Sequence, residues 1–220
     1  MYRSQVIRIL LVCHLFLFFS ASAGTHTAPV SQHSLKTSRV EAEKKAAPEF
    51  VQSYLRSNEE TLKLIRQKSR STFRMMEKVL RKYNLPVELK YLAVVESELK
   101  NTALSPVGAA GTWQLMPETA RVLGLHVSDS VDERLNPHLS TKAASLYLRD
   151  LYREFDNWLL VLAAYNCGPG PVYKAIRLSG SRDFWELQQY LPAESRGHVK
   201  KYIATHQYFE GTDSGFLAAR

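Results

Sequence analysis

The chain has 220 residues, of which 45% are hydrophobic and 23% charged, with 10 glycines and 9 prolines. These proportions are ordinary for a globular protein and exclude a collagen-like, low-complexity or wholly disordered chain. The formal net charge is +8, and two cysteines are too few for a disulfide-stapled scaffold. At this length we expect one compact domain with some additional chain.

The first 23 residues have the pattern of a secretory signal peptide. Arg3 and Arg8 provide a basic start, residues 9–19 are almost wholly apolar, and Ala21-Ser22-Ala23 is a small-residue cleavage site. The apolar run is about 11 residues long, shorter than the roughly 20 that a membrane-spanning helix needs. We therefore expect an exported protein, located in the periplasm or cell envelope.

Three more segments surround the expected main domain. Residues 24–48 are rich in Thr, Ser, Ala and Lys and lack apolar periodicity, which predicts a flexible linker. Through residues 49–84 apolar side chains recur at spacings of three, four and seven, which predicts an N-terminal extension of one or two amphipathic helices. The main domain is expected at residues 85–210, followed by a flexible tail at residues 211–220.

The pattern within residues 85–210 is helical throughout. Pro86 can open a helix over residues 87–97 whose second half is apolar nearly all round, which is typical of a buried central helix. No sustained two-residue alternation occurs, so the fold class is predicted to be all-α. Further helices are expected at residues 117–124, from a cap at Ser140 or Thr141 to Phe155, and at residues 158–165, 172–178, 184–190 and 192–209.

Glu96 is the residue that the pattern itself indicates for catalysis. It follows the apolar run 92–95, so the helix carries a carboxyl group into an apolar interior, where its charged form is disfavoured. A carboxylic acid that keeps its proton can protonate the leaving oxygen of a glycosidic bond. A structural Glu that meets a buried Arg or a backbone amide is the alternative, and the residues alone leave both open.

A second carboxylate for Glu96 is not visible. Glu98 is two positions further on, which on a helix rotates it by about 200° from Glu96. The two-carboxylate arrangement of most glycosidases is therefore not apparent. The histidines show no metal-ligand spacing, and Cys167 lacks a His at a recognisable nucleophile spacing.

Three separated motifs resemble the soluble lytic transglycosylase family of the lysozyme-like superfamily. They are Glu96-Ser97, residues 105–117 (SPVGAAGTWQLMP) and residues 163–168 (AAYNCG). The resemblance implies a lysozyme-like (goose-type/transglycosylase) helical domain, peptidoglycan glycan strands as the substrate, and neither a metal nor an organic cofactor. The positive charge of an exported protein favours cell-wall polymers over nucleic acid as its partner, and we expect a monomer associated peripherally with the envelope.

The resemblance also implies roles for single residues. Glu96 is implied to be the acid and base of the reaction, and Tyr165 to contact its carboxyl group. Ser105 is implied to hydrogen-bond near the cleaved sugar, and Gln114 and Met116 to line the saccharide groove. The residues implied to bind substrate are Ser105, Gln114, Met116, Tyr165, Asn166 and His198.

His198 departs from the family pattern, because members usually have a tyrosine there. A neutral ring beside Glu96 can replace the tyrosine as a hydrogen-bond partner. A charged ring would favour ionised Glu96 and weaken it as an acid. A solvent-facing ring without any coupling to the site is the third alternative.

Together these features predict an enzyme that cleaves the β-1,4 bond between N-acetylmuramic acid (MurNAc) and N-acetylglucosamine (GlcNAc). Glu96 would protonate the leaving oxygen and then accept the proton of the C6 hydroxyl as a 1,6-anhydro ring closes. One carboxylate can serve both steps, so no partner is needed. A hydrolytic muramidase and a catalytically impaired wall-binding protein are the alternatives.

The export pattern predicts where the mature chain starts. N-terminal sequencing of the exported protein should find Gly24 or a residue close to it. Attachment of lipid at Cys13 is not expected, because Val12 is bulky where a small residue is required. Recovery of a membrane-associated form with lipid on Cys13 would contradict this prediction.

Overall fold

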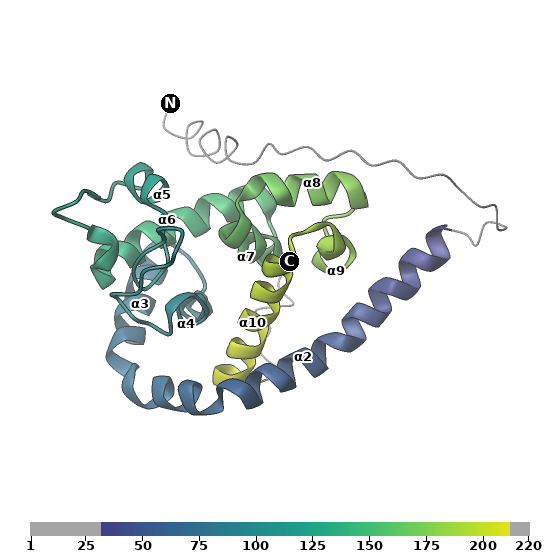
Figure 1. Ribbon diagram of the computed structural model, residues 1–220, viewed down its shortest axis with the longest axis horizontal. Helices are drawn as coiled ribbons and strands as arrows, with labels where there is room; N and C mark the ends of the chain where they lie inside the picture. Colours follow the sequence, from purple (N-terminus) through teal and green to yellow (C-terminus); the bar gives the residue numbers. More distant parts are fainter. Residues whose placement is uncertain (1–31, 212–220) are drawn as a thin grey trace.

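The computed structural model describes residues 32–211 and shows an all-helical architecture over that range (Figure 1). The expected signal peptide, and all of the expected tail except Gly211, lie outside the described residues. Three isolated bridges between short loop segments are the nearest approach to a sheet within residues 32–211. The all-α prediction is confirmed.

The helices follow the predicted order with adjusted boundaries. The α-helices are α2 (Gln32–Lys68), α3 (Arg70–Lys82), α4 (Lys90–Ser97), α5 (Pro117–Val122), α6 (Pro137–Phe155), α7 (Trp158–Cys167), α8 (Pro169–Ser179), α9 (Phe184–Leu187) and α10 (Ala193–Glu210). Short 3-10 helices are η1 (Val87–Leu89), η2 (Glu133–Leu135) and η3 (Gln188–Tyr190).

Helix α2 begins inside the segment that we expected to be a linker. The structure has a helix from Gln32 and includes Pro48, which we had taken as the end of the linker. Proline has a helical φ and costs the helix one hydrogen bond, whereas the Glu, Lys and Ala residues at positions 41–47 are good helix formers. One or two helices were expected for residues 49–84, and this segment contains the second part of α2 and, after a break at Ser69, all of α3.

Helix α7 is at the centre of the core. Its residues 160–164 are fully buried. A helix that is apolar on every side must be enclosed, and α6, α8 and α10 pack around it. Asn157 caps its N-terminus by accepting hydrogen bonds from the backbone N–H groups of Leu159 and Leu160.

Helix α6 starts earlier than expected. Its cap is Asn136, whose side chain accepts hydrogen bonds from the N–H groups of His138 and Leu139. The prediction of a cap at Ser140 or Thr141 was wrong. Both residues are buried within the first five residues of the helix, where their hydroxyl groups donate back to backbone carbonyls.

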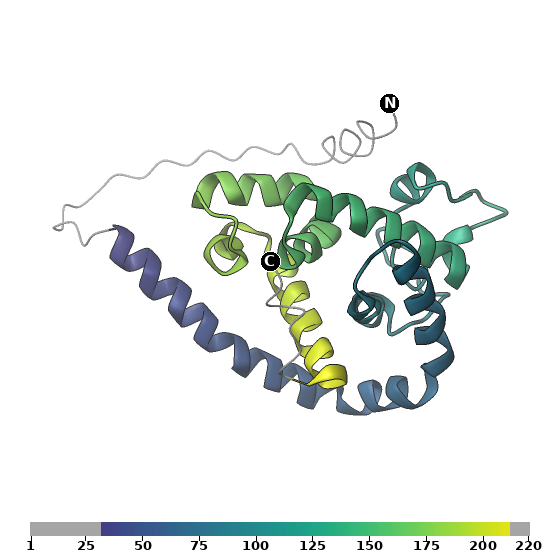
Figure 2. The ribbon, with the colours of Figure 1, turned by 180° about the vertical axis from the view of Figure 1, so that it is seen from behind.

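The remaining helices surround the core and bring distant segments together. Figures 1 and 2 show α2 along one edge of the molecule, where it contacts α10 and α9. Helix α10 lies between α2 and α7 and also contacts α4. None of the helices within residues 32–211 combines the length and apolarity needed to cross a membrane.

Candidate active site

Glu96 lies in the last turn of α4, at the point where this buried helix reaches the edge of the core. Only 13% of its side chain is exposed. The Nε2 atom of His198 lies 2.9 Å from Oε1 of Glu96, and the His198 side chain is 8% exposed. The solvent-facing alternative for His198 is therefore wrong, because α10 turns the ring onto the carboxyl group.

Helix α10 is tied to α7 close to this contact. The hydroxyl of Ser195, a fully buried residue, donates to Oδ1 of Asn166 at 2.7 Å. Asn166 thus uses its side-chain oxygen to join two helices. His198 is one turn further along α10, so the same bond helps to place its ring.

The loop between α4 and α5 folds back over the end of α4. The Ser97 hydroxyl donates to the carbonyl of Thr112 at 2.9 Å, and the Tyr165 hydroxyl donates to the carbonyl of Trp113 at 2.7 Å. The indole N–H of Trp113 donates to the hydroxyl of Thr141 at 2.9 Å. The loop is consequently held to α4, α6 and α7 beside Glu96.

The hydroxyl of Tyr165 bonds to the loop, and its interaction with Glu96 is a separate matter. A phenol has one proton to donate, and Tyr165 gives it to the Trp113 carbonyl. Burial, followed by the negative charge of Glu96, raises the pKa of Tyr165 well above its usual range. The hydroxyl therefore stays protonated and holds the loop, while its interaction with Glu96 is electrostatic.

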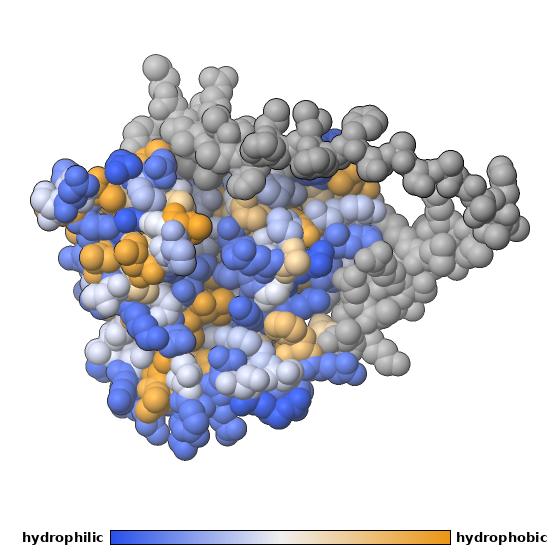
Figure 3. All heavy atoms as spheres, viewed as in Figure 1, coloured by the Kyte–Doolittle hydropathy of each residue, from blue (hydrophilic) through white to orange (hydrophobic). Residues whose placement is uncertain are grey.

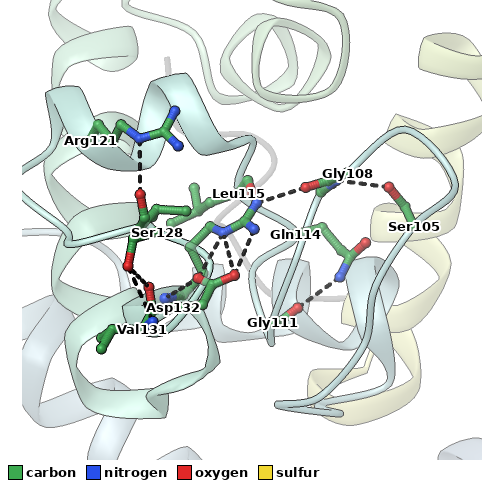
Figure 4. Close-up of polar contacts among 12 residues, drawn as sticks. Ser105, Gly108, Gly111, Gln114, Leu115, Arg121, Ser128, Val131 and Asp132 are labelled. Atoms are coloured by element: carbon green, nitrogen blue, oxygen red, sulfur yellow. Dashed lines mark hydrogen bonds and ion pairs between the residues drawn. The ribbon is translucent and has the colours of Figure 1, made fainter.

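The other expected substrate-binding residues lie on this same loop. Ser105 accepts a hydrogen bond from the N–H of Ala109 at 2.9 Å. Gln114 has a left-handed φ of +46°, and its amide donates to the carbonyl of Gly111 at 2.9 Å, as Figure 4 shows. Met116 precedes α5 and is 39% exposed. Ser105, Gln114 and Met116 thus lie on one loop, and the hydrogen bonds of Ser105 and Gln114 stabilise it.

A buried ion pair, to which the sequence motifs assigned no role, anchors the loop between α4 and α5. Arg134 is 5% exposed. Its Nη1 atom donates to the carbonyls of Gly108 at 2.7 Å and Leu115 at 2.9 Å, and its Nη2 atom pairs with Asp132 at 2.7 Å (Figure 4). One guanidinium thereby connects both ends of the loop. The signal was the Asp-x-Arg spacing within the region of resemblance.

Gly111 allows the loop to approach this anchor closely. Its φ is +77°, and a Cβ atom there would lie 2.0 Å from the carbonyl oxygen of Arg134. Only glycine fits such a contact without displacing the backbone. Gly108, at the other side of the loop, also has a positive φ of +87° but has open space around it.

Exposed apolar side chains are concentrated on this part of the molecule. Five of the eight large apolar residues exposed within the described range lie between positions 104 and 135. Figure 3 shows apolar surface interspersed with polar surface on the face seen in Figure 1. The five residues are Leu104, Val107, Met116, Val131 and Leu135.

Comparison with protein families identifies this arrangement. The model of the transglycosylase SLT domain matches residues 74–188, which is more than half of the chain. The chain belongs to this family. The match includes α4 with Glu96, the loop with Ser105 and Gln114, and α7 with Tyr165.

Several relatives of this SLT-domain protein are known. Membrane-bound lytic murein transglycosylase D of Escherichia coli K12 is 42% identical over 130 residues, which are 57% of this chain and 28% of the relative. Soluble lytic murein transglycosylase of the same strain is 33% identical over 138 residues, 58% of this chain and 21% of the relative. The chain thus spans about a quarter of the length of these curated relatives.

A solved structure shows the same fold. The crystal structure of the 70-kDa soluble lytic transglycosylase from Escherichia coli superposes with a TM-score of 0.53 at 30% sequence identity. The superposition covers 61% of this chain and 24% of the other. The lysozyme-like transglycosylase fold expected from the sequence is confirmed.

The close approach at Gly111 predicts a difference between two glycine substitutions. Gly111→Ala should lower the free energy of unfolding by at least about 3 kcal/mol. The new methyl group overlaps a backbone carbonyl, and the alanine must also adopt a positive φ. Gly108→Ala has the positive φ alone and should cost about 1 kcal/mol. Urea unfolding measures both, and equal losses would contradict the steric argument.

The ion pair predicts a pH-dependent stability difference. Hydrogen bonding to Arg134 lowers the pKa of Asp132. The stability that this ion pair contributes is therefore present above the ordinary carboxyl pKa of about 4 and is lost as pH falls through the lowered pKa. Asp132→Asn should cost about 2 to 4 kcal/mol at pH 7, since it leaves Arg134 without its counter-charge. Urea unfolding of both proteins should show this gap narrowing below about pH 4, whereas a constant gap would contradict the assignment.

Proposed function

We propose that this protein is an exported lytic transglycosylase that cleaves the MurNAc–GlcNAc β-1,4 bond of peptidoglycan and leaves a 1,6-anhydro-MurNAc end. The observation that carries the proposal is Glu96, a nearly buried carboxyl group at the end of α4 that is held by His198, next to Ser97, which bonds to the loop between α4 and α5. The names of the two bacterial relatives support the same substrate class.

Glu96 can carry both halves of the reaction. In the first step the carboxyl group gives its proton to the glycosidic oxygen, and the bond from that oxygen to C1 of MurNAc breaks. In the second step the resulting carboxylate takes the proton of the C6 hydroxyl, and O6 bonds to C1. Glu96 ends protonated as it began, and no water is consumed.

The surroundings of Glu96 favour this route over hydrolysis. Glu98 is at the end of α4 with a left-handed φ of +55°, and its half-exposed side chain pairs with Lys100 at 2.6 Å. It is therefore unsuited to act with Glu96 as the second carboxylate of a hydrolase. The intramolecular C6 hydroxyl makes a second acid unnecessary.

Substrate contact is assigned to the loop beside Glu96. Ser105, Gln114 and Met116 present polar and apolar groups on one loop, which suits sugar rings that have hydroxyl edges and apolar faces. Tyr165 and Asn166 support this surface from α7 through their bonds to Trp113 and Ser195. Removal of residues 1–23 takes away Arg3 and Arg8 and no acidic residue, which leaves a net charge of +6 that favours approach to an anionic wall.

Replacement of the proposed acid tests the function. Glu96→Gln should lower turnover of purified peptidoglycan by about 10⁴-fold or more, because the amide cannot deliver a proton and general acid/base steps each contribute about 10² to 10⁴. The fold, measured by circular dichroism, should be kept. Glu98→Gln is the matched control and should retain most of the activity.

Product masses separate the alternatives. Digestion by the wild-type protein should release muropeptides with anhydro ends. Reducing ends, which are heavier by one water, would identify a hydrolytic muramidase, and intact sacculi would identify a wall-binding protein without activity. Wild-type turnover by the Glu96→Gln variant would remove Glu96 from the mechanism.

A further inference from the structure

The two nitrogens of the His198 ring have different surroundings. Nε2 lies 2.9 Å from Oε1 of Glu96. Nδ1 is buried and has no hydrogen-bond partner within the described residues. The ring is therefore satisfied on one side only, and this asymmetry limits where its proton can be.

A neutral imidazole carries one N–H, and the geometry distinguishes its two positions. With the proton on Nε2, the ring donates to Oε1 and leaves only a lone pair unpaired at Nδ1. With the proton on Nδ1, a buried N–H would lack an acceptor and would carry its full desolvation cost. An imidazolium has that same unpaired N–H. Hydrogen bonding therefore favours the neutral ring with the proton on Nε2.

The neighbouring side chains leave the donor role to His198. Tyr165 of α7 has already given its proton to Trp113. Burial raises the pKa of Tyr165 and of Tyr54 on α2, so both phenols stay neutral. Glu98 and Lys201 line a separate cavity between α2 and α4 and reach solvent.

We propose that His198 is a positioning residue for Glu96. It donates Nε2–H to Oε1 as a neutral ring, which orients the carboxyl group and leaves Oε2 as the oxygen that exchanges the proton with substrate. This inference rests on the proposed function. The N–H of the ring takes the place of the tyrosine hydroxyl that family members usually have at this position.

The hydrogen bond would also assist the first step. Once Glu96 has given up its proton, the same Nε2–H faces a carboxylate, and a charge-assisted hydrogen bond is stronger than a neutral one. An interaction that strengthens as the proton leaves lowers the barrier to that step without tightening substrate binding. The effect of His198 should therefore appear in kcat and leave KM nearly unchanged.

A series of three variants tests the donor role. His198→Phe keeps a ring but has no donor, and its kcat should fall by about 10- to 100-fold with KM changed less than about threefold. His198→Gln and His198→Tyr each retain a donor and should keep kcat within about fivefold of wild type. Their pH–rate profiles should have the same midpoints as wild type, because each variant still presents a neutral hydrogen-bond donor to Glu96.

Nitrogen-15 NMR of histidine-labelled protein reads the ring directly. At the pH of maximal activity, His198 should show a protonated Nε2 and a bare Nδ1. The matched control is His206→Gln, which removes another buried imidazole of α10, one that stacks on Tyr202. This control should leave the midpoints of the pH–rate profile unchanged.

Three results would overturn the proposal: a protonated Nδ1 at that pH, wild-type kcat in His198→Phe, or displaced profile midpoints in His198→Tyr. If His198→Phe does not fold, as judged by thermal melting, the NMR spectrum and the other two variants still decide. Failure of the proposed function can be distinguished from failure of the proposal for His198. It would appear as a lack of anhydro products from the wild-type protein, whereas the NMR measurement needs no substrate.

Discussion

The need to enclose α7 organises this molecule. Residues 160–164 of that helix are apolar and fully buried, so water must be excluded from its whole circumference. Helices α6, α8 and α10 accomplish this together. Because α7 ends in Tyr165 and Asn166, the same packing delivers the two side chains that fasten the α4–α5 loop and α10 around Glu96.

The loop beside Glu96 buries Trp113 and Leu115 in the core, and polar contacts fix the backbone between them. Arg134 supplies donors to carbonyls at both ends of the loop, and Asp132 balances its charge. A buried guanidinium is acceptable only where its donors are paired, as they are here. The donors of Arg134 and the carboxylate of Asp132 that support the loop are thus paired, and Gly111 permits the close approach that this pairing requires.

Glu96 and His198 lie where the core around α7 meets the loop between α4 and α5. The carboxyl group comes from a helix of the core, and the imidazole comes from the helix that closes the core on the other side. The Glu96 side chain is little exposed, and its hydrogen bond with His198 fixes the orientation of the carboxyl group. The bond occupies one carboxyl oxygen and leaves the other available. That arrangement explains how a single carboxylate could serve two proton transfers in turn.

The sequence by itself determined the helical class, the order of the helices and the family, and it indicated Glu96 as the candidate acid, because apolar periodicity and motif spacing are local properties of the chain. It placed boundaries less well: the pattern ends a linker at Pro48, inside α2, and does not indicate Asn136 as a cap, since a local pattern does not show which hydrogen bonds a fold will satisfy. Only the tertiary structure decided that Tyr165 bonds to Trp113, that Arg134 anchors the loop and that His198 meets Glu96. Residues 96 and 198 are 102 positions apart, and their contact arises from the packing of α4 and α10, which no local pattern encodes.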